Sequence, residues 1–147
     1  MKAALVYDSV YGNTEKAAMA IAAELKATCD IRVLRATEVD PSALERIDLL
    51  IVGSPTQWNK ALKTIRHFLG DIPPMKLLGV QAMVFDTRLP SKFVGALGYA
   101  AGKMAAALKK KGAKIVSING FLVAEGGMKI QESELARAAE WGRSFGR

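Results

Sequence analysis

The chain has 147 residues, of which 50% are hydrophobic and 24% charged, with 21 lysines and arginines against 14 aspartates and glutamates. This balance excludes intrinsic disorder, and the length predicts one domain, residues 1–147, with its own core. A single cysteine and a single histidine exclude an intrachain disulfide and cysteine-rich or histidine-rich metal centres. No apolar run approaches the roughly 20 residues of a membrane span, so we expect a soluble, cytoplasmic protein.

Short apolar runs alternate along the chain with longer segments of helical period. Buried strands are predicted at residues 3–7, 31–34, 48–53, 80–85 and 115–118, and a further apolar run at 121–123 either continues the last strand or stands apart. Helices are predicted at residues 14–27, 61–69, 98–111 and 133–145. Asp40 caps a short helix that ends near Arg46. The alternation predicts an α/β fold with a doubly wound, five-stranded parallel sheet and helices on both faces.

Ligands of such sheets bind beyond the carboxyl ends of the strands, near the point where the strand order reverses. The loop after the first strand, residues 9–14, contains hydroxyls and small residues but no lysine or arginine. A phosphate there would be held by backbone N–H groups, the helix dipole and the side chains of Ser9, Asn13 and Thr14. Gly12 permits a backbone turn that a side chain would block. The alternative is an ordinary strand-to-helix loop in which Thr14 caps the helix.

The segments after the third and fourth strands also carry candidate ligand-binding groups. Trp58 lies on a polar loop beyond a buried strand, so its indole either turns back into the core or offers a flat face to a ligand. Asn59 tolerates a positive φ. Asp86, Thr87 and Arg88 form either a local ion-pair turn or a set of hydrogen-bonding groups for a heteroaromatic ring.

The three loops together resemble the flavodoxin family. Residues 6–14 resemble its phosphate-binding signature, and residues 53–59 resemble its second flavin loop. Residues 85–88, with the alanine-rich helix that follows, are similar to one branch of flavodoxin-domain proteins. The likeness spans essentially the whole chain and matches the short-chain form. It implies the strand order 2-1-3-4-5, bound FMN, and electron transfer between redox partner proteins.

The resemblance also implies individual roles for the residues of the three loops. The phosphate would be held by Ser9, Val10, Tyr11, Gly12, Asn13 and Thr14. One face and edge of the flavin would be lined by Pro55, Thr56, Gln57, Trp58 and Asn59, with Trp58 stacked on the ring. The pyrimidine end and the other side would meet Asp86, Thr87 and Arg88, with Phe93 or Tyr99 as the aromatic cover.

Two questions about the chemistry stay open at this point. Arg88 beside the ring would favour a negatively charged reduced flavin, whereas an Arg88 paired with Asp86 would not approach it. An enzymatic alternative is a flavin-dependent reductase or oxidase acting on a quinone or a porphyrin precursor.

Two other protein classes with a related fold are disfavoured. A receiver domain is disfavoured because no acid directly follows the third strand, and a dinucleotide-binding domain is disfavoured because no G-x-G-x-x-G turn exists.

The formal net charge of +7 points to an acidic partner or substrate. Nucleic acid is disfavoured because few aromatic residues are interleaved with the lysines. Residues 87–124 contain no aspartate or glutamate and hold seven lysines and arginines, which equals the whole excess. The basic excess therefore belongs to the segment that begins at the expected flavin edge. The electron donor, the acceptor and the oligomeric state stay open.

Overall fold

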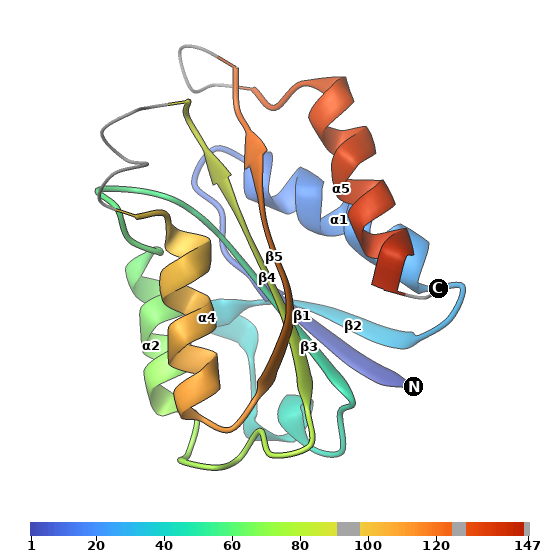
Figure 1. The fold of residues 1–147 in the computed structure, drawn as a ribbon, viewed down its shortest axis with the longest axis vertical. Coiled ribbons are helices and arrows are strands. Elements are labelled where there is room, and N and C mark those ends of the chain that lie inside the picture. The colour runs from blue at the N-terminus through green and yellow to red at the C-terminus, as the bar shows by residue number, and fades with distance from the viewer. Residues whose placement is uncertain (91–97, 125–128, 146–147) are drawn as a thin grey trace.

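The computed structural model describes residues 1–90, 98–124 and 129–145, which fold into a five-stranded sheet between two layers of helices (Figure 1). The strands are β1 (Lys2–Tyr7), β2 (Asp30–Arg35), β3 (Leu49–Pro55), β4 (Gln81–Arg88) and β5 (Lys114–Leu122). Neighbouring strands are parallel throughout, in the order β2-β1-β3-β4-β5. The predicted α/β class and the implied strand order are both confirmed.

Among the described residues, four α-helices cover the sheet: α1 (Asn13–Leu25), α2 (Lys63–Asp71), α4 (Ala100–Lys110) and α5 (Glu132–Phe145). Helices α1 and α5 lie on one face and α2 and α4 on the other (Figure 1). Two short 3-10 helices, η1 (Ala36–Glu38) and η2 (Pro41–Leu44), follow β2. Asp40 caps η2 as predicted, since its Oδ1 accepts from the Ala43 N–H at 3.1 Å, but the helix ends at Leu44. None of the helices in the described part of the chain is long and apolar enough to cross a membrane.

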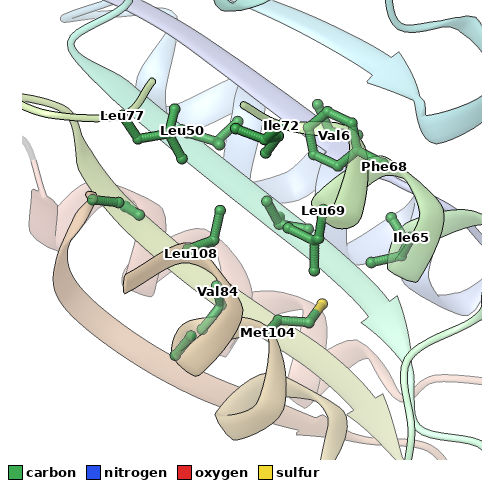
Figure 2. Packing of buried hydrophobic residues seen from close by; sticks show 14 of the residues in the cluster. Val6, Leu50, Ile65, Phe68, Leu69, Ile72, Leu77, Val84, Met104 and Leu108 are labelled. Atoms are coloured by element: carbon green, nitrogen blue, oxygen red, sulfur yellow. The ribbon is translucent and has the colours of Figure 1, made fainter. Parts of the chain in front are cut away.

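Two hydrophobic clusters flank the sheet because successive strand residues point to opposite faces. Leu5 and Phe85 pack toward α1 and α5, whereas Val6 and Val84 pack toward α2 and α4. Figure 2 shows the second cluster, in which Leu69 of α2 and Met104 of α4 approach the central strands. Burial on both faces explains why the inner strands are continuous apolar runs in the sequence.

Strands β4 and β5 are longer than predicted. β4 continues to Arg88, and β5 runs without a break to Leu122, because the two strands pair along this whole length. The predicted loop after the fourth strand is therefore strand. The side chains of Asp86 and Arg88 share one face of the sheet, and Thr87 points to the other.

Gly142 marks the place where α5 crosses α1. A methyl group added there would lie 2.9 Å from the carbonyl oxygen of Ile21 and 3.2 Å from its Cα. A rotamer change cannot relieve a clash with backbone atoms. We expect Gly142→Ala to lower the free energy of unfolding in urea by about 1–3 kcal/mol, although alanine gains about 1 kcal/mol in helix propensity.

Gly102 of α4 is the matched control for this substitution. An added methyl group there meets no atom within 4 Å, so only helix propensity changes. Gly102→Ala is expected to raise the free energy of unfolding by up to about 1 kcal/mol. Equal effects of the two substitutions would mean that α1 and α5 are not in close contact.

Candidate functional site

A cavity of about 260 Å3 opens at the carboxyl ends of β1, β3 and β4, where the strand order reverses between β1 and β3. Its lining draws on all three predicted loops: Ser9, Val10, Tyr11, Asn13, Thr14, Pro55, Thr56, Gln57, Thr87 and Arg88. Leu89 and Val123 complete the lining, and the sequence does not single them out. Their position directly after β4 and β5 is the signal that could have found them.

The loop of residues 9–14 leads into α1, and no side chain caps the N-terminus of this helix. Gly12 is the N-cap residue, with φ +87°, and its N–H donates to Ser9 Oγ at 3.0 Å. The first N–H groups of a helix have no intrahelical acceptor, so this end of α1 can receive an anion. The prediction that Thr14 caps the helix is wrong, because the N-cap residue is Gly12 and Thr14 lies within α1.

Asn13 and Thr14 attach the start of α1 to the rest of the site. The Asn13 Oδ1 accepts from the Ile130 N–H at 2.8 Å, before α5. The hydroxyl of Thr14 lies 2.7 Å from the hydroxyl of Thr87 at the end of β4. Asn13, Thr14 and Thr87 are all buried, so these bonds fix the loop of residues 9–14 relative to β4 and to the segment before α5.

Residues 57–60 form a tight turn that carries Trp58 at its tip. Gln57 and Lys60 exchange two backbone hydrogen bonds of 2.9 Å, and Trp58 and Asn59 have φ values of 50° and 65°. Positive φ at both central residues identifies a type I′ turn. Trp58 is 92% exposed, so its indole does not turn back into the core. Such backbone strain costs about 1–3 kcal/mol and concentrates at functional sites.

The end of β4 carries a buried ion pair. The carboxylate of Asp86, which is fully buried, accepts from Arg88 Nε at 2.6 Å and Nη2 at 2.9 Å, and from the Ala101 N–H of α4 at 3.0 Å. The guanidinium of Arg88 also stacks on Tyr99, 3.5 Å from the ring centroid. The local ion pair is thus the interpretation that the geometry supports for these residues. Phe93 lies outside the described residues.

Four of the predicted site residues do not line the cavity. They are Gly12, Trp58, Asn59 and Asp86. Gly12 shapes the helix start behind the lining residues, and Trp58 and Asn59 form the turn beside Gln57, which does line it. Asp86 is held beneath Arg88 and the first turn of α4, so it can act on a ligand only through Arg88.

A polar network next to the loop of residues 9–14 joins the ends of β1 and β2 to α1 and α2. Arg35 pairs with Asp8 at 2.8 Å and with Glu15 at 2.7 Å, and Asp8 also accepts from the hydroxyl of Thr64. The hydroxyl of Tyr7 donates to Glu15 at 3.1 Å. The pKa of Tyr7 is raised, with burial as the largest cause and this hydrogen bond as the second. The sequence does not indicate this network, which forms because Arg35 lies opposite Tyr7 in the sheet register.

The fold and the cavity define a doubly wound α/β protein with a ligand site at its switch point. The family model described as flavodoxin matches residues 5–142, and the chain belongs to the flavodoxin family. It is accordingly an FMN-binding protein that carries electrons to partner proteins. No curated protein sequence matches the chain significantly.

Solved structures share the fold. A flavodoxin from the domain Archaea superposes with a TM-score of 0.81 at 23% identity, covering 99% of this chain and 96% of the other. Oxidised flavodoxin 1 from Bacillus cereus gives a TM-score of 0.80 at 23% identity, with 99% and 97% covered. Rubredoxin oxygen:oxidoreductase from Desulfovibrio gigas gives 0.75 at 19% identity, covering 99% of this chain but 35% of that one.

Proposed function

We propose that FMN binds in the cavity at the ends of β1, β3 and β4, with its phosphate at residues 9–14 and its ring against the 57–60 turn. The observation that carries this proposal is the meeting of all three predicted loops around one cavity. The donor set fits the group, because hydroxyls, the uncapped start of α1 and Arg88 surround the cavity. No carboxylate occurs among the described residues that line it.

Bound FMN supplies the redox chemistry, and this chain supplies binding and electrostatics. Gly12 lets the backbone N–H groups of α1 approach the phosphate. Trp58, which adjoins the lining residue Gln57, would cover one face of the ring and exclude water from it. Arg88 lines the cavity while it is paired with Asp86, and because that carboxylate balances its charge, its field at a bound ring would be weaker than that of an unpaired cation.

Riboflavin separates recognition of the phosphate from recognition of the ring, because it lacks only the phosphate of FMN. A hydrogen bond to a charged group contributes about 1.5–3 kcal/mol. Two such bonds to the phosphate predict that FMN binds at least about 100-fold more tightly than riboflavin. Titration of the apoprotein with each flavin, followed by the quenching of flavin fluorescence, measures this ratio. Equal affinities would exclude residues 9–14 as a phosphate site.

Replacement of Gly12 tests the same loop through its backbone. An added methyl group at Gly12 meets no atom within 4 Å, so the penalty comes from its φ of +87° alone. We expect Gly12→Ala to lower the free energy of unfolding by about 1–2 kcal/mol and to weaken FMN binding more than riboflavin binding. Gly102→Ala, at ordinary φ, should leave both affinities unchanged. An unchanged ratio of the two affinities in Gly12→Ala would contradict a phosphate at this turn.

We propose further that the chain acts as a single cytoplasmic domain, residues 1–147, whose redox partner presents an acidic surface. The net charge of +7 supports this, since complementary charge steers association. Assays with NADPH and a quinone separate a carrier from a flavin-dependent reductase or oxidase. A carrier exchanges electrons in stoichiometric amounts and shows no sustained turnover, whereas steady-state consumption of NADPH would favour the enzyme.

A further inference from the structure

A second cavity, of about 360 Å3, forms a groove between α2 and α4, which lie side by side on one face of the sheet (Figure 1). Its floor includes Leu69 of α2 and Met104 of α4, and Figure 2 shows these side chains above the central strands. Its rim carries five cationic side chains: Lys60, Arg66, Lys103, Lys110 and Lys111. We call this feature the basic groove.

The charge of the basic groove is not balanced within the described part of the chain. None of its lining residues is acidic, and none of its five cations occurs in an ion pair between described residues. Three of the five side chains donate hydrogen bonds to backbone carbonyl oxygens. Arg66 Nε donates to the Ala61 oxygen at 3.2 Å, Lys103 to the Asn59 oxygen, and Lys111 to the Gly70 oxygen at 3.3 Å. Five uncompensated cations around an apolar floor define a surface complementary to an acidic, partly apolar ligand.

The cations are spread along the groove and do not converge on one point. Lys103 and Lys110 are seven residues apart on α4, which corresponds to a rise of about 10 Å. This spacing does not suit a small anion such as a single phosphate. It matches acidic residues two turns apart on a second helix, whose apolar side chains could then enter the floor.

We propose that the basic groove is the docking site for an acidic amphipathic helix of a protein partner. The proposal rests on the proposed function in one respect, that the partner is a redox protein. Lys103 donates a hydrogen bond to the Asn59 carbonyl oxygen, and Lys60 pairs through its backbone with Gln57 in the turn that carries Trp58. One end of the groove therefore adjoins the rim of the flavin cavity, and a helix docked there lies beside the exposed indole.

A designed peptide of about 18 residues, long enough to be helical, serves as the probe, with leucines along one face and glutamates beside them. Its binding to FMN-loaded protein and to apoprotein is measured by fluorescence anisotropy. We expect Lys103→Glu/Lys110→Glu to weaken binding about tenfold and Lys103→Gln/Lys110→Gln to weaken it less, in line with the small energies of exposed ion pairs. Lys2→Glu/Lys26→Glu changes the net charge equally outside the groove and should leave binding nearly unchanged.

Several outcomes would overturn the proposal. Equal losses in the groove and control variants would mean that net charge alone attracts the peptide. Equal binding by a peptide with serines in place of the leucines would mean that the apolar floor is not used, as for a simple anion site. Persistence of binding when the ionic strength rises from about 0.1 M to about 1 M would exclude the charged rim. Normal FMN binding without peptide binding would reject this inference and leave the proposed function intact.

Discussion

Replacing Asp86 by alanine is expected to cost about 3–5 kcal/mol of unfolding free energy, the largest effect of any substitution considered for this chain. The carboxylate is fully buried and accepts hydrogen bonds from both Arg88 and the Ala101 N–H. Its removal leaves a largely buried guanidinium without its counter-charge and the first turn of α4 without an acceptor. Against a typical stability of about 5–15 kcal/mol this loss is severe, and urea denaturation of the apoprotein measures it.

Two comparisons isolate the ion pair from a general effect of losing an aspartate. Asp71→Ala removes an exposed carboxylate from the end of α2 and should change stability by less than about 0.5 kcal/mol. In an Arg88→Met background, Asp86→Ala should cost less than in the wild type, with a coupling energy of about 0.5–3 kcal/mol. Additive effects of the two substitutions would mean that Asp86 and Arg88 do not depend on each other.

Trp58→Ala is expected to weaken FMN binding without destabilising the apoprotein. Stacking of a flat ring on an aromatic side chain contributes about 1–3 kcal/mol, which corresponds to a loss of about 5–150-fold in affinity. Because Trp58 is 92% exposed, its truncation removes almost no packing, and the unfolding free energy should change by less than about 0.5 kcal/mol. Titration with FMN and urea denaturation measure the two quantities separately.

Trp141 provides the opposite case in the same chain. Its indole is buried against Phe85 and Phe121, and its Nε1 donates to Ser117 Oγ at 2.7 Å. Trp141→Phe should lower the free energy of unfolding by about 1–3 kcal/mol and leave FMN affinity unchanged. Should Trp58→Ala retain full affinity for FMN, the ring does not stack on the 57–60 turn.

The loops at the carboxyl ends of β1 and β3 are predictable from sequence because their chemistry is local. Gly12 lies between a strand and a helix, where a left-handed residue is needed, and it has φ +87° in the structure. Asn59 tolerates the positive φ that the turn requires. The residue types at these positions indicate the backbone conformation that they adopt. No contact with a distant residue is needed to infer that conformation.

The behaviour of the end of β4 is not predictable in this way. The sequence predicts a polar loop at residues 86–88, because this run contains two charged side chains and a hydroxyl. They form strand because β5 pairs with them and because α4 and α1 supply partners, the Ala101 N–H for Asp86 and the Thr14 hydroxyl for Thr87. These partners are distant in sequence, so no local sequence pattern predicts them.

The order of elements, the parallel sheet and the loops after β1 and β3 follow from the sequence alone, because apolar periodicity and turn residues act over a few positions. Three features depend on contacts between distant segments: Trp58 is exposed, Asp86 is buried beneath Arg88, and five cations lie along one groove. The burial of Asp86 depends on where α4 packs on the sheet, and the groove depends on the packing of α2 and α4. That packing is set by long-range burial, and it brings three cations of the basic segment 87–124, Lys103, Lys110 and Lys111, into one groove with Lys60 and Arg66.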